Sequence, residues 1–359
     1  MDDECAGVLA ASDAEPGDGD YDLAHHGDAE VAPDMVDLAV NVRMSAPPGW
    51  LLQELRDSLD TLAAYPDVST AVAAIAARHR RERVDVVPTS GGAEAFGLLA
   101  AALRPRHAVV VHPQFTEPEA ALRAAGHPVQ RVHLSPTTGF ELDPGLIPHG
   151  ADLVFVGNPT NPTSTLHPAE SLRELCIPGR LVVVDEAFAD AVPGEPESLA
   201  DTRTSGLVVL RSLTKTWGIA GLRAGYVLAE PEITQRLRAV QPPWSVSTPA
   251  ATAMTACSRP GALREADALA RDAERDREVL VAGLRARGAE VAGTPRAPFV
   301  LVRFDDGARV RERLRAAGYA LRRCDTFPGL DSDWLRIAVR DRCTSQGLLA
   351  ALDRILGTA

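Results

Sequence analysis

Lys215 is the only lysine in the chain, and the other 36 of the 37 Lys and Arg residues are arginines. An arginine stays protonated at any working pH, whereas a lysine amine can lose its proton and attack a carbonyl. The one lysine that this arginine-biased sequence retains therefore points to amine chemistry. Schiff-base formation requires a primary amine, most often with pyridoxal phosphate (PLP) as the carbonyl partner. A single surface lysine retained by chance is the alternative.

The residues around Lys215 suit such a cofactor. Asp185 directly follows the apolar run 181–184, which predicts a buried strand, and ligands of open α/β sheets bind beyond the carboxyl ends of strands. A carboxylate there can pair with a protonated pyridine nitrogen, although it can also cap a helix. Ser212 and Thr214 flank Lys215, and Arg223 follows, so two hydroxyls and a guanidinium are available to a phosphate.

Segment 211–226 resembles the lysine motif of fold type I PLP enzymes, in the class I and II aminotransferase family. The resemblance spans about residues 36–357. It implies that Lys215 forms the Schiff base with PLP and that Asp185 pairs with the ring nitrogen. It also implies that Asn161, in the Asn-Pro-Thr-Asn-Pro-Thr motif, binds the phenolic oxygen. Further cofactor contacts implied by the resemblance come from Gly92, Ala93, Glu94, Phe115, Ser212, Thr214 and Arg223.

The resemblance also implies substrate contacts and a partner chain. Arg336, which interrupts the apolar run 335–339, and Arg322 match arginines that bind the anionic groups of the substrate, and Asn41 lies in an early substrate-binding segment. For each arginine the alternative is an ordinary surface residue. Tyr65 matches a tyrosine that reaches the cofactor phosphate of a second subunit, which implies a homodimer with shared active sites.

The pattern of apolar runs predicts the fold class. Strands and helices alternate between residues 84 and 228, which predicts an α/β layer with a mostly parallel sheet. Beyond Pro242 and Pro243 the pattern changes to a smaller α+β unit. We expect an acidic flexible arm over 1–35, a large PLP-binding domain over 36–243 and a small domain over 244–359, in the fold type I PLP-dependent transferase fold. The adjacent His25 and His26 are expected in a solvated loop, with metal binding as the alternative.

Composition excludes several classes of partner. The net charge of −12 and a pI near 5.3 argue against nucleic acid or an anionic membrane as the main partner. No apolar run approaches the roughly 20 residues that span a bilayer, and the acidic N-terminus does not resemble a secretory signal. Five scattered cysteines without a CxxC pair predict reduced thiols in a cytoplasmic protein, with neither a metal nor a disulfide framework.

Three functions are compatible with this pattern. The expected one is a PLP-dependent aminotransferase acting on a small phosphorylated amino substrate, similar to histidinol-phosphate aminotransferase. The alternative is the L-threonine O-3-phosphate decarboxylase of cobalamin biosynthesis, which Phe188, standing where the family usually has tyrosine, and segment 327–330 favour. The third is a non-catalytic PLP-fold binding protein. The joint presence of Lys215, Asp185, Asn161 and Arg223 argues against this third function.

Overall fold

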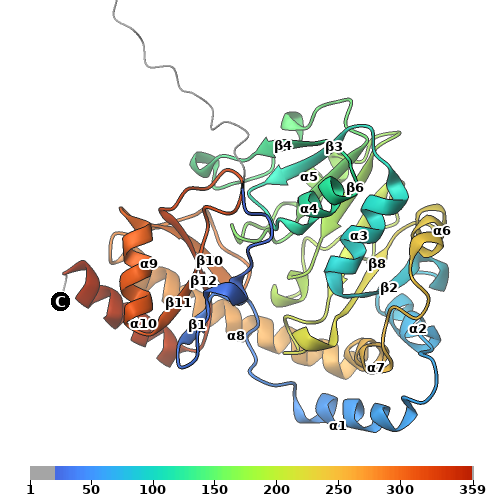
Figure 1. The fold of residues 1–359 in the computed structure, drawn as a ribbon, viewed down its shortest axis with the longest axis horizontal. Coiled ribbons are helices and arrows are strands. Elements are labelled where there is room, and N and C mark those ends of the chain that lie inside the picture. Colours follow the sequence, from blue (N-terminus) through green and yellow to red (C-terminus); the bar gives the residue numbers. More distant parts are fainter. Residues whose placement is uncertain (1–20, 358–359) are drawn as a thin grey trace, which may run out of the picture.

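The computed structural model describes residues 21–357, which form a large and a small unit, each built around one sheet (Figure 1). The large sheet has seven strands in the order β2-β8-β7-β6-β5-β3-β4, and all neighbours are parallel except that β8 runs antiparallel to β2 and β7. Its strands are β2 (Val86–Ser90), β3 (Ala108–His112), β4 (Val129–His133), β5 (Leu153–Gly157), β6 (Leu181–Asp185), β7 (Leu207–Ser212) and β8 (Ala224–Leu228).

Buried apolar strands explain why this sheet lies between two layers of helices. Successive residues of a strand face opposite sides, so a strand covered on both sides needs a continuous apolar run. In β6, Val182 and Val184 pack into one core cluster, and Val183 packs into the other. The first cluster includes residues of α1 (Gly49–Ser58), α2 (Ser69–Arg78), α5 (Ala169–Glu174) and α7 (Thr248–Cys257), and the second includes residues of α3 (Gly91–Leu103), α4 (Glu117–Ala124) and α6 (Pro231–Val240).

The small unit holds a five-stranded sheet in the order β1-β11-β12-β10-β9. Its strands are β1 (Val36–Leu38), β9 (Glu290–Val291), β10 (Phe299–Arg303), β11 (Tyr319–Arg323) and β12 (Trp334–Ala338). Its core also takes in apolar residues of three helices, α8 (Pro260–Arg285), α9 (Gly307–Ala316) and α10 (Arg342–Leu356). The pale orange helix α8 extends from beneath the large unit to the small one (Figure 1). This architecture agrees with the expected α/β fold class.

The N-terminal part differs from the expected flexible arm. Residues 1–20 lie outside the described residues, but residues 21–35 pack against both units, and the blue N-terminal chain runs between them in Figure 1. Glu30 is buried and pairs with Arg311 of α9, whereas Thr116 Oγ1, before α4, donates to the carbonyl of Leu23. The expectation was wrong for residues 21–35, because contacts with distant segments order them despite their acidic composition.

The expected domain boundaries at residues 36 and 244 stay a prediction, and two elements make contacts across them. Strand β1 lies in the range assigned to the large domain but pairs in parallel with β11 of the small sheet. Helix α7 lies in the range assigned to the small domain but packs against α1 and α2. Within residues 21–357, no helix is long and apolar enough to cross a membrane.

Candidate active site

A pocket of about 540 Å³ lies at the carboxyl ends of β5, β6 and β7, between the large and the small unit. It brings together most of the residues singled out by the sequence. Those that line it are Asn41, Gly92, Ala93, Phe115, Asn161, Asp185, Ser212, Thr214, Lys215, Arg223, Arg322 and Arg336. The carboxyl ends of parallel strands meet at one edge of a sheet, so residues distant in sequence converge there.

Lys215 is partly buried in this pocket, and its electrostatic surroundings favour the neutral amine. Loss of water around the amine, with the nearby charges of Arg336 and Arg223, lowers the pKa of Lys215 to about 8, although Asp185 and Asp28 oppose the shift. With this pKa, about a tenth of the amine is neutral at pH 7, far more than for an ordinary lysine, and the neutral amine is the form that nucleophilic attack requires.

Asp185 is the last residue of β6. Its carboxylate is the one at that end of the strand that faces the pocket. Removal from water raises the pKa of Asp185 to about 6, although the hydrogen bond from the Ala187 N–H group and the charge of Lys215 act to lower it. The Ala187 N–H group donates to Asp185 Oδ1 at 3.0 Å, which fixes the direction of the carboxylate. At neutral pH the group is therefore mostly ionised and can stabilise a cation bound in the pocket.

An anion-binding cradle forms where α3 begins beside the end of β7. The Ser212 and Thr214 hydroxyls lie 2.8 Å apart, and Arg223 and the first turn of α3 border the same pocket. Gly91 has a φ of 73°, and a Cβ atom there would collide with the Arg223 guanidinium. Glycine thus lets the helix start approach the arginine, and a helix N-terminus with hydroxyl and guanidinium donors suits a phosphate. These donors, together with Asp185 and Lys215, fit PLP.

Arg336 connects the small unit to the large one. Its Nη1 donates to Asn161 Oδ1 at 2.5 Å, its Nη2 donates to the Ala39 carbonyl, and its guanidinium lies 5.6 Å from the centre of the Phe299 ring. Burial, with a contribution from Arg322, lowers its pKa to about 9, so the guanidinium remains largely charged at neutral pH. Its Nε is buried and has no hydrogen-bond partner among the described residues. The Nε–H group of Arg336 is therefore an unused donor.

Arg322 also lines the pocket, but other parts of the chain occupy both of its terminal nitrogens. Nη1 donates to the Arg323 carbonyl at 2.5 Å, and Nη2 donates to the His25 carbonyl and to Thr326 Oγ1, both at 2.7 Å. The guanidinium also lies over the Phe327 ring. Arg322 thus holds the N-terminal segment against the small unit, which is a role that the sequence did not predict.

The N-terminal segment supplies pocket residues that sequence reasoning missed, namely His25, His26, Gly27 and Asp28. His26 Nε2 lies 2.8 Å from Glu117 Oε1, and its ring lies 5.7 Å from that of Phe115. His25 Nε2 lies 3.0 Å from Glu30 Oε1. Both histidines lie in a loop, as expected, but their side chains are partly buried, with exposed fractions of 20% for His25 and 39% for His26. The described residues contain no cluster of His, Cys, Asp or Glu that could hold a metal. Two adjacent histidines in an otherwise acidic stretch were the available signal.

Two of the predicted cofactor residues lie away from the pocket lining. The Glu94 carboxylate accepts a hydrogen bond from the Ser90 N–H group at the start of α3. Tyr65 is 75% exposed and stacks on Trp244 with 4.2 Å between the ring centres. In one chain, therefore, Tyr65 does not reach its own pocket.

Phe188 lines the pocket and packs edge-on against Phe299, with 4.9 Å between ring centres.

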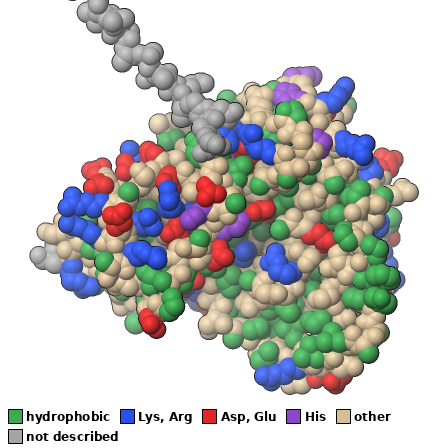
Figure 2. Space-filling view, in the orientation of Figure 1, with side chains coloured by type: hydrophobic (Ala, Val, Ile, Leu, Met, Phe, Trp, Pro, Cys, Tyr) green, Lys and Arg blue, Asp and Glu red, His purple; other side chains and the backbone are tan. Residues whose placement is uncertain are grey.

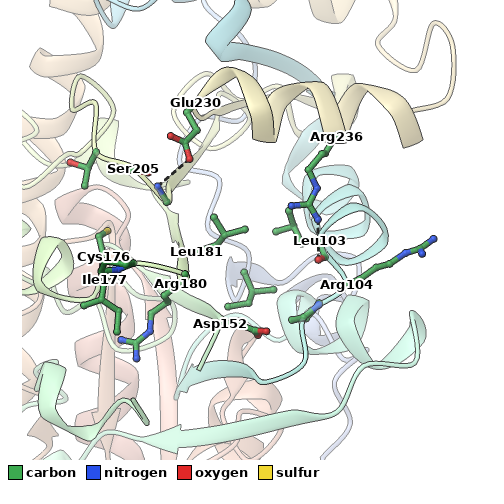
Figure 3. A pocket seen from close by; sticks show the side chains of 16 residues that line it. Leu103, Arg104, Asp152, Cys176, Ile177, Arg180, Leu181, Ser205, Glu230 and Arg236 are labelled. Atoms are coloured by element: carbon green, nitrogen blue, oxygen red, sulfur yellow. Dashed lines mark hydrogen bonds between the residues drawn. The ribbon is translucent and has the colours of Figure 1, made fainter. Parts of the chain in front are cut away.

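A second pocket, of about 620 Å³, lies at the opposite, amino ends of the strands (Figure 3). Two of its arginines bind backbone carbonyls. Arg180 donates to the carbonyls of Ala151 and Pro148, and Arg236 donates to those of Ala102 and Leu103. These contacts satisfy carbonyls at the ends of helices and loops, so the guanidinium groups of Arg180 and Arg236 are engaged by the chain itself.

Known proteins resemble this chain over most of its length. The family model described as aminotransferase class I and II matches residues 33–355. A histidinol-phosphate aminotransferase of Mycobacterium tuberculosis is 51% identical, over 88% of this chain and 86% of its own. A threonine-phosphate decarboxylase of Salmonella typhimurium is 29% identical, over 91% and 93%. The crystal structure of a histidinol-phosphate aminotransferase from Clostridium acetobutylicum superposes with a TM-score of 0.82 at 24% identity, covering 90% of this chain and 99% of that one, which supports the fold.

We expect borohydride to fix one PLP per chain on the peptide that contains Lys215. The chain has no other side-chain amine, so a Lys215→Arg variant should lose both the label and the visible absorbance of the holoenzyme. Mass spectrometry of digested protein checks the label. Label on another peptide, or full activity of Lys215→Arg, would refute the assignment.

Proposed function

The chain belongs to the class I and II aminotransferase family, and we propose that it is a PLP-dependent enzyme that removes the amino group of a small phosphorylated substrate. The substrate would resemble that of histidinol-phosphate aminotransferase, the name of the 51% identical relative. The observation that carries the proposal is the set of Lys215, Asp185 and the phosphate cradle in one pocket that also contains two arginines of the small unit.

The residues of the large unit would hold the cofactor. We propose that Ser212, Thr214, Arg223 and the first turn of α3 bind its phosphate, and that Asp185 pairs with its ring nitrogen. Arg336 donates to Asn161 Oδ1, so the amide nitrogen of Asn161 is left to donate toward the phenolic oxygen. Phe115, next to Phe96 and His26, would pack against the ring.

Lys215 would also move the proton. When bound, PLP supplies an electron sink that allows a bond to the amino-bearing carbon of the substrate to break. With a pKa of about 8, the Lys215 amine can accept a proton and release it again near neutral pH. The neighbouring Arg336 and Arg223 disfavour a second positive charge and so promote the release.

Decarboxylation of L-threonine O-3-phosphate, a step of cobalamin biosynthesis, remains the second candidate. Phe188 and segment 327–330 favour it through the family resemblance, and Phe188, which packs on Phe299, has no hydroxyl to offer the cofactor. The threonine-phosphate decarboxylase of Salmonella typhimurium is a more distant relative than the aminotransferase. Both reactions would use the same pocket, so the two candidates are distinguished by which substrate the enzyme converts.

The deciding experiment supplies each substrate to the holoenzyme. We expect histidinol phosphate with 2-oxoglutarate to give glutamate, measured by a coupled dehydrogenase assay. Release of CO₂ from threonine phosphate, without glutamate formation, would replace the proposal with the second candidate. Neither product would contradict both.

Arg336→Ala should lower kcat/KM by about 10²-fold or more, if Arg336 binds an anionic group of the substrate. Loss of one charge-assisted contact, with its partner left unpaired, costs roughly 2–4 kcal/mol. Arg303→Ala, on the neighbouring strand β10, removes a half-exposed arginine and should leave kcat/KM unchanged. An unaffected kcat/KM in Arg336→Ala would show that Arg336 acts only as a link between the units.

We propose that two chains form a homodimer with shared sites. Tyr65 and Trp244 form an exposed aromatic pair, and Leu59 and Leu62 are more than half exposed nearby in sequence. Figure 2 shows apolar side chains gathered over the region of α2 and α7, whereas charged side chains spread over the small unit. Exposed apolar groups of this kind are typical of protein interfaces.

Light scattering should therefore give about twice the chain mass of 38.1 kDa. If Tyr65 completes the site of the partner, Tyr65→Ala should weaken PLP binding, and Tyr65→Phe should show how much of the loss is due to the hydroxyl. A monomer with full PLP affinity would contradict the shared site.

A further inference from the structure

A small cavity of about 40 Å³, with both apolar and polar residues in its walls, adjoins the main pocket beside Lys215. Asn41 and Lys215 line both spaces. The other walls come from Arg43 and Met44, from the turn at Ala189–Ala191, and from α8. A volume of about 10–15 Å³ is enough for one water molecule, so the cavity has room for more than one.

The polar atoms of this cavity lack partners within the described part of the chain. Asn41 Oδ1, Arg43 Nη1 and Asp190 Oδ1 are buried and form no hydrogen bond there. Asp190 is only 4% exposed and Asn41 only 7%. Burial raises the pKa of the Asp190 carboxyl, and the nearby Thr216 hydroxyl opposes this shift, but the two groups do not meet in hydrogen-bond geometry. Buried polar groups are normally paired, so their concentration in one cavity indicates an occupant.

The chemistry of these atoms identifies the occupant. Arg43 Nη1 can only donate a hydrogen bond, whereas Asn41 Oδ1 and an ionised Asp190 can only accept one. A halide could not donate to the two oxygens, and a metal cation would be repelled by the guanidinium. Water both donates and accepts. The Arg43 guanidinium is also fixed in place, because its Nη2 donates to Asp276 Oδ2 at 2.8 Å.

We propose that this cavity binds water and that Asp190, acting through that water, is a positioning residue that favours the charged form of the Lys215 amine. The charged groups that already act on Lys215 are Arg336 and Arg223, which disfavour the charged amine, and Asp185 and Asp28, which favour it. Asp190 itself is influenced by Arg211, Glu195 and Arg78. The hydrated cavity would thus oppose the two arginines of the main pocket. Its importance for catalysis rests on the role proposed above for Lys215.

The single lysine allows a direct test without cofactor or substrate. Full-length apoprotein labelled with [6-¹³C]lysine should give one ¹³Cε resonance, and its titration reports the pKa of Lys215, expected at about 8. We expect Asp190→Asn to lower the titration midpoint. Ala273→Val, which adds bulk to the cavity wall, should displace water and lower it too. Asp57→Asn, on the exposed surface of α1, is the control for a change of net charge and should leave it unchanged.

Equal midpoints in Asp190→Asn and Ala273→Val and in the unsubstituted protein would overturn the proposal. Should Asp190→Asn fail to fold, Ala273→Val alone decides.

A crystal structure of the full chain provides the second measurement. We expect water density within hydrogen-bond distance of Arg43 Nη1 and Asp190 Oδ1. A dry cavity, or an anomalous signal there from bromide or thallium soaks, would overturn the assignment of water. Both measurements are independent of the borohydride label on Lys215, so failure of the water site and failure of the proposed function are distinguishable.

Discussion

Removal of the Lys215 amine from water is the interaction on which the rest of the site depends. It lowers the pKa of the amine to about 8, and the arginines on either side act in the same direction. The same loss of water raises the pKa of Asp185 to about 6. The pKa of the amine is thus lowered toward neutral pH, and the pKa of the carboxyl is raised toward it. Burial of opposite charges in one pocket thus gives an amine that can both carry and release a proton, next to a carboxylate that remains mostly charged.

The two units and the N-terminal segment together enclose this environment. Arg336, on β12, donates to Asn161 in the large unit and to Ala39 in the segment after β1. Arg322 holds the His25 carbonyl, and His26 contacts Glu117 at the start of α4. Charged hydrogen bonds therefore cross the opening between the units at several points. Because guanidinium groups make several of these contacts, the arginines that supply positive charge to the pocket also keep its walls together.

Several functional positions follow from local sequence. Lys215, Ser212 and Thr214 come directly after or at the end of an apolar strand, and the fold type I resemblance rests on such linear motifs. Gly91 begins a helix after strand β2, so its place in the cradle could be predicted from local sequence, although its close approach to Arg223 could not. The acidic composition of the first residues, in contrast, predicted a flexible arm where residues 21–35 are packed, because composition carries no information about distant partners.

The sequence by itself determined the chemistry. A lone lysine and a carboxylate that each follow a strand meet in one site whenever those strands lie side by side in one parallel sheet. Only the tertiary structure decided which residues complete the pocket. Strand β1 has three residues, too few for a periodic signal, and it is placed by its pairing with β11 near the other end of the chain. In the segment that follows this strand, Asn41 and Arg43 line one cavity with Asp190, and the Ala39 carbonyl accepts from Arg336. Such contacts depend on how sheets and helices pack at long range, which the local spacing of residues does not encode.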